Sequence, residues 1–96
     1  MNTIHLKQPY KLRENRLKRY ETHYQIPAER CVIVPVRNFG EDIACDVRWK
    51  DNNGELQAKE GLLFKIENIE PINAMKNYQL HELWTSYMEL SEPLKN

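Results

Sequence analysis

The sequence predicts a single domain of the mainly β class with flanking helices (α+β), built as a small antiparallel barrel of four or five strands. Three observations predict it: an alternating segment at residues 42–50, turn signals on both sides of it, and helical spacing of apolar residues near each end. A chain of 96 residues makes one domain and can bury a modest core without metal or disulfide staples. We therefore predict one domain over residues 1–96, with a helix at 10–25, a barrel at 31–73 and a helix at 74–90.

The alternating segment 42–50 is the clearest element, because apolar and charged residues follow one another along it. Side chains of a strand alternate between its two faces, so this segment has one buried face and one wet face. The buried face holds Ile43, Cys45, Val47 and Trp49. The pair Asn53-Gly54 follows closely and predicts a tight hairpin, because both residues accept positive φ angles.

The neighbouring strands are predicted from composition. Residues 31–36 form a continuous β-branched run of the kind that is buried on both faces. Pro35 cannot donate a ladder hydrogen bond, which places it at a sheet edge or a bulge. After the hairpin, the pattern predicts two more strands at 55–59 and 61–66, and a short extended piece within 68–73.

In this order of elements, residues 31–73 resemble the SH3-like barrels, a group that includes SH3, Tudor and KOW modules. The resemblance consists of a long apolar strand, a glycine turn, the alternating strand, the Asn-Gly hairpin, an apolar strand and a proline-containing turn. It implies an SH3-like fold and no particular function. The acidic and aromatic cluster with which SH3 domains grip proline-rich ligands has no counterpart in this sequence. A Tudor-type aromatic cage is not supported either, because only Phe39, Trp49 and Phe64 are available and two of them point inward.

The helix predicted at 10–25 is basic. Leu17, Tyr20 and Tyr24 recur at steps of three and four, which gives a narrow apolar stripe, and Pro27 prevents continuation. The first thirty residues carry seven Lys or Arg against three Glu, a net charge of +4, while residues 51–96 carry four Lys against eight acids, a net charge of −4. Either the two ends attract each other, within one molecule or between molecules, or the basic end meets a separate polyanion.

Nucleic-acid binding through this helix is the alternative function that the sequence suggests. Its cations would contact phosphates while a tyrosine stacks on a base. The residues assigned to this role are Lys11, Arg13, Arg16, Lys18, Arg19 and Tyr20. A charged helix face is more often simply solvated, and Glu14 and Glu21 dilute the positive field.

The helix predicted at 74–90 has a wide apolar stripe, part of which we expect to pack on the barrel. Large aromatic side chains and Met are enriched where proteins meet, and self-association would extend the buried surface of so small a domain. The residues assigned to protein binding are Leu80, Trp84, Tyr87 and Met88. The leading hypothesis is therefore a small non-enzymatic binding or adaptor protein whose partner is a protein or a second copy of the chain.

Catalysis and cofactor binding receive little support from the sequence. Cys31 and Cys45 lie in apolar strands, where a free thiol usually acts as a small core residue, and their spacing from each other and from the three histidines matches no metal site. The carboxylate pairs Glu41-Asp42 and Glu67/Glu70 lie in turns, so a small enzyme with a cysteine or carboxylate site remains a remote alternative. We expect no catalytic residues, metal, cofactor or membrane partner, and the lack of an apolar leader favours the cytoplasm.

Overall fold

The computed structural model describes the backbone of residues 4–91 and the side chains of residues 4–86. Within this part of the chain, one antiparallel sheet of five strands has the order β4-β3-β2-β1-β5. The strands are β1 (Tyr10–Leu12), β2 (Val32–Phe39), β3 (Asp42–Lys50), β4 (Leu56–Lys65) and β5 (Ile69–Pro71). The predicted α+β class is confirmed. In these residues, however, β4 and β5 stand at opposite edges, so the sheet is open and the predicted closure into a barrel is not seen.

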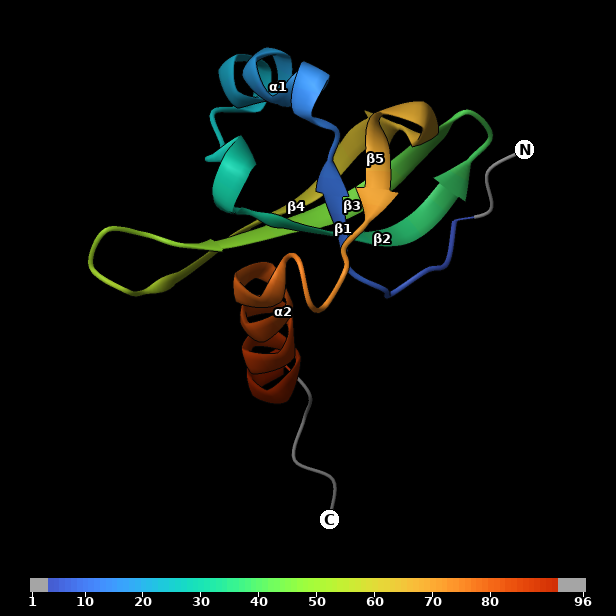
Figure 1. The fold of residues 1–96 in the computed structure, drawn as a ribbon. Coiled ribbons are helices and arrows are strands. Elements are labelled where there is room, and N and C mark those ends of the chain that lie inside the picture. Colours follow the sequence, from blue (N-terminus) through green and yellow to red (C-terminus); the bar gives the residue numbers. More distant parts are fainter. Residues whose placement is uncertain (1–3, 92–96) are drawn as a thin grey trace.

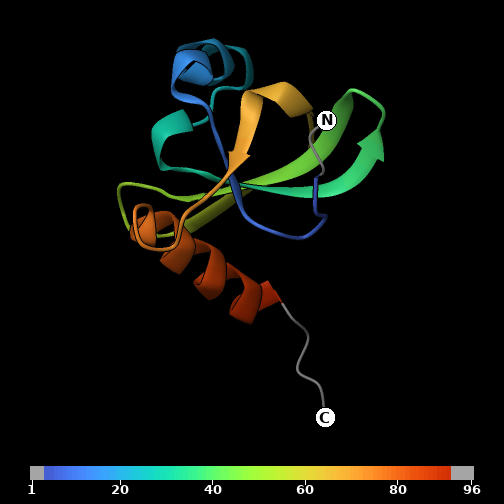
Figure 2. The same ribbon diagram turned by 45° about the vertical axis from the view of Figure 1, so that its right-hand side comes forward.

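Two helices cover opposite sides of this sheet (Figures 1 and 2). α1 (Leu17–Tyr24) lies in the connection between β1 and β2, and α2 (Tyr78–Ser91) follows β5. Short 3-10 helices complete the connections: η1 (Glu14–Arg16), η2 (Ala28–Arg30) and η3 (Ile66–Asn68). None of the described helices has both the length and the apolar character needed to cross a membrane.

The central strand β2 is buried on both faces along its first half, as its β-branched composition predicts. Ile33 belongs to the core on the α1 side, whereas Val32 and Val34 belong to a second cluster on the α2 side. The pairing of β2 with β3 shifts register between Pro35 and Arg37. The predicted placement of Pro35 at a bulge is therefore confirmed, and its missing N–H disturbs the ladder only where pairing is already irregular.

On β3, the predicted buried face is confirmed. Ile43, Cys45 and Val47 are fully buried in the core on the α1 side, and Trp49 packs against the same core while partly exposed. Cys31 joins this core as well, and both cysteines are free thiols. Their expected role as small core residues is confirmed.

The two strands predicted after the hairpin form one strand, β4. Gly61 suggested a break, but its φ of +72° instead forms a bulge where the pairing of β3 with β4 shifts between Cys45 and Val47. The Gly61 amide lies 3.4 Å from the Asp46 carboxylate oxygen and donates to it. A glycine thus bends the strand without ending it.

The predicted helix at 10–25 is wrong in its first half. Tyr10–Leu12 forms β1, which pairs with β5 and, through Tyr10, with Ile33 of β2. Tyr10 and Leu12 are buried on one face of this strand with Lys11 between them. Burial of every second residue is the pattern of a strand and not of a helix. The helix proper begins at Leu17 and ends at Tyr24, because Gln25 adopts a left-handed conformation just before Pro27.

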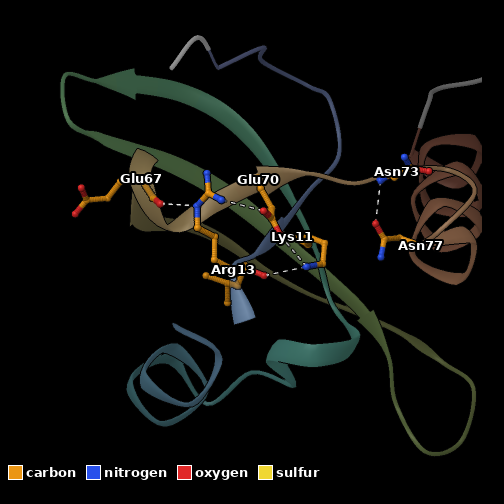
Figure 3. A network of polar contacts seen from close by, with 7 residues as sticks. Lys11, Arg13, Glu67, Glu70, Asn73 and Asn77 are labelled. Atoms are coloured by element: carbon orange, nitrogen blue, oxygen red, sulfur yellow. Dashed lines mark hydrogen bonds and ion pairs between the residues drawn. The ribbon is translucent and has the colours of Figure 1, made fainter. Parts of the chain in front are cut away.

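The second helix also begins later than predicted, at Tyr78 in place of residue 74. Residues 74–77 form turns, and the Asn73 side-chain oxygen accepts hydrogen bonds from the amides of Met75 and Lys76. The Asn73 amide in turn donates to the Asn77 side-chain oxygen at 2.9 Å (Figure 3). This compact turn sets the direction in which α2 leaves β5.

Candidate binding groove

A groove of about 920 Å³ runs between α2 and the rest of the domain. We call it the α2 groove; it is lined by residues 29–30, 76–83 and 85–86 and by Lys11 and Lys50. These residues come from η2, from β1, from the last position of β3 and from α2 with the turn before it. The groove therefore exists only because the fold joins segments that are far apart in the sequence.

The position of α2 against the sheet creates the groove. Leu83 is buried against Val32 and Val34 of β2, and Leu80 and Trp84 pack around this contact. Because this apolar seam holds α2 on the sheet, the residues of its first two turns border the groove. Leu80 contributes to both the seam and the groove.

The apolar part of the groove lies at the start of α2. Tyr78 lines the groove with 57% of its surface exposed. Leu80, which is partly buried, and Leu83, which is buried, line the same groove. A large exposed aromatic next to apolar surface is typical of positions that anchor a binding partner.

Cations border the groove on both walls. Arg30 and Lys50 stand on the wall formed by η2 and β3, and Lys76 stands at the foot of α2. All three side chains are exposed, and none forms an ion pair within the described part of the chain. The acids Glu29 and Glu82 also line the groove, so its charge is mixed with a positive excess.

The cations assigned to nucleic-acid binding are divided by the structure, and three of them contact the segment from η3 to β5. Lys11 Nζ and Arg13 Nη1 lie 3.0 and 2.9 Å from the two carboxylate oxygens of Glu70 (Figure 3). Arg13 Nε also donates to the Glu67 carbonyl, and Arg16 Nε donates to the Asn68 side-chain oxygen. Part of the basic front therefore attracts the acidic rear within one molecule, as one of the two interpretations of the charge pattern requires.

The remaining residues of that set differ from one another. Tyr20 is only 7% exposed, and its ring packs on Phe64 at 5.0 Å between centroids, so it is not available to stack on a base. Lys18 and Arg19 are exposed on α1. The predicted cationic face is thus reduced to two adjacent residues on the helix, and Tyr20 serves the core.

The residues assigned to protein binding lie on α2. Leu80 borders the groove, while Trp84 packs against the second core with its ring centroid 5.6 Å from that of His81. The indole nitrogen of Trp84 is buried and has no hydrogen-bond partner within the described residues. Tyr87 and Met88 fall outside the residues whose side chains are described.

The other chemical groups lie apart from the groove. Burial raises the pKa of the Cys31 and Cys45 thiols to about 12 in each case, which disfavours the thiolate that a nucleophile requires. Asp42 pairs with Lys65 at 3.2 Å. In the part of the chain that is described, no group of three or more His, Cys, Asp or Glu side chains is arranged to hold a metal ion.

Sequence reasoning missed Arg30, Lys50, Lys76 and Tyr78. They come from three separate segments, and only Lys76 and Tyr78 are close in sequence, so no local pattern joins them. What these residues share is a position around one groove, and this position can be recognised only once the order of the strands and helices in space is known. No family model, curated protein or solved structure matches this chain.

Proposed function

We propose that this protein is a small non-enzymatic binding module that takes a segment of a partner protein into the α2 groove. One observation carries the proposal: the fold brings the exposed Tyr78, the apolar surface of Leu80 and three cations without ion-pair partners in the described chain to one groove. Concave sites with apolar surface and a few convergent polar groups are where proteins usually bind their ligands.

We also propose that the architecture is SH3-like. The strands β2, β3 and β4 follow one another as an antiparallel meander, and the short strand β5, which contains Pro71, follows the 3-10 helix η3. This order supports the resemblance drawn from residues 31–73. The fold assignment adds no ligand, so the choice of partner rests on the groove alone.

Nucleic-acid binding by the basic helix has less support. Three of the five cations assigned to this role lie outside α1 and contact Glu70, Glu67 or Asn68, and the only aromatic residue assigned to it is buried. A cysteine enzyme has less support still, because a thiol with a pKa near 12 stays protonated at neutral pH. The free, buried cysteines favour our assignment to a reducing cytoplasm.

The proposal is tested by replacing Tyr78 with a photoreactive phenylalanine in the intact chain and irradiating native cells. The matched control carries the same group at Thr22, an exposed position on α1. We expect protein adducts from position 78 that survive nuclease treatment, and far fewer from position 22. Equal labelling from both positions, or adducts that disappear with nuclease, would contradict the proposed function.

A further inference from the structure

Resting on the proposed function, we infer that the segment bound in the α2 groove is an acidic peptide whose carboxylates face Arg30, Lys50 and Lys76 and whose apolar side chain covers Tyr78. The inference concerns ligand chemistry and not only the location of the site. It follows from the charges and the apolar side chains that line the groove.

The three cations are positioned to receive carboxylates from a ligand. Arg30 belongs to η2, Lys50 ends β3 and Lys76 precedes α2, so the positive charges lie on both walls of the groove. They are exposed and make no ion pair within the described residues, unlike Lys11, which lies 3.0 Å from Glu70. An arginine guanidinium can hold a carboxylate through two parallel hydrogen bonds, and lysines add attraction without fixed geometry.

A peptide accounts for the mixed charge better than a nucleic acid does. Glu29 and Glu82 line the same groove as the cations. A continuous phosphate backbone would place charges against these acids, whereas a peptide can carry its carboxylates at chosen positions. Only Tyr78 among the described lining residues offers an exposed aromatic ring, which is too few for successive bases to stack.

Apolar contact completes the site. The exposed ring of Tyr78 and the partly buried side chain of Leu80 both line the groove at the start of α2. Each of them lines the groove and offers apolar surface to a side chain of the ligand, while Leu83 lies deeper against β2. Such a central apolar anchor with charged groups around it is the arrangement that gives small interfaces their affinity.

A library of short random peptides, selected on the intact 96-residue chain, tests this inference. The selected peptides are then measured against three variants by fluorescence anisotropy. One is Tyr78→Ala, one reverses the groove charges (Arg30→Glu, Lys50→Glu, Lys76→Glu), and the matched control reverses three exposed cations elsewhere (Lys7→Glu, Lys18→Glu, Arg19→Glu). Circular dichroism and thermal melting verify that each variant is folded. Single-stranded oligothymidine is titrated in parallel.

We expect the selected peptides to be rich in Asp and Glu and to contain an apolar residue. Groove reversal should raise the Kd of the selected peptides by about tenfold or more, and Tyr78→Ala should also raise it. The control reversal should leave the Kd within about twofold of the wild-type value. Peptides that need Tyr78 but are neutral or basic would overturn the acidic ligand while keeping the proposed function. If the peptides bind the two groove variants as tightly as the wild type, or if no peptides are selected, the acidic ligand and the proposed function are both overturned. Tighter binding of oligothymidine that the groove reversal abolishes would overturn the choice of a peptide.

Discussion

The side-chain amide of Asn68 donates a 2.8 Å hydrogen bond to the hydroxyl oxygen of Tyr20, and both side chains are buried. This contact joins α1 to η3 across 48 positions of sequence. Asn68 also accepts a hydrogen bond from Arg16 Nε through its side-chain oxygen. One buried asparagine therefore ties η1 and α1 to the segment that leads into β5, which orients α1 on the core.

Replacing Asn68 with Ala is expected to lower the free energy of unfolding by about 2 kcal/mol, because it leaves the Tyr20 hydroxyl and Arg16 Nε without their partner. Urea denaturation followed by circular dichroism measures the loss. The exposed Asn15→Ala variant is the control and should change stability by less than about 0.5 kcal/mol. If the two variants were equally stable, the buried network would not hold α1.

Replacing Gly61 with Ala is expected to destabilise the protein by about 1 kcal/mol, since a side chain is strained at a φ of +72°. The cause would be backbone strain and not crowding, because no heavy atom lies within 4 Å of the added carbon. Thermal melting beside the neighbouring Glu60→Ala variant isolates the effect. A Gly61→Ala variant at least as stable as the wild type would contradict the bulge.

Both thiols are expected to resist a disulfide reagent in the folded protein at pH 8. Burial raises the pKa of Cys31 and Cys45 to about 12, so the reactive thiolate is scarce and the sulfur is also inaccessible. In denaturant, where a cysteine pKa is about 8.5, both should react at once. The number of cysteines that react is measured from the absorbance of the thiolate that the reagent releases. Rapid labelling of either cysteine before unfolding would place that residue outside the core.

The hairpin carboxylate Asp51 is expected to make stability depend on pH in the acid range. Its side chain accepts hydrogen bonds from the amides of Glu55 and Asn53 and from Gln57, with the Glu55 amide the largest cause of a lowered pKa. This contribution is present above the unfolded pKa of about 3.9 and is lost as the pH falls through the lower folded value. As the pH is lowered, the free energy of unfolding should therefore fall less steeply for Asp51→Asn than for the wild type. Parallel curves would contradict this role.

Much of the sheet could be predicted from the sequence because its signals are local. The period-two burial of Ile43, Cys45 and Val47 and the continuous apolar run of β2 are visible without knowing the pairing. Strand β1 was missed because three residues are too few to show a period, so Tyr10 and Leu12 were absorbed into the helix that follows. Gly61 was misinterpreted because a glycine that forms a bulge and one that ends a strand look alike in sequence.

The candidate groove could not be predicted for a different reason. Arg30, Lys50 and Lys76 are about twenty residues or more apart, and only the strand order and the turn before α2 bring them to one place. Charge counts along the chain assigned the positive excess to the first thirty residues. In the structure, part of that excess is balanced by Glu70. Two of the cations that line the groove, Lys50 and Lys76, lie outside the first thirty residues.

The central claim, that the α2 groove is the binding site, is tested most directly by backbone amide shifts of the isotopically labelled chain. An acidic peptide selected on the protein is titrated in while the spectrum is recorded. We predict that the largest shifts fall on residues 29–30, 50 and 76–86, around the groove lining. Largest shifts on α1 near Lys18 and Arg19, with the groove amides unmoved, would contradict the account.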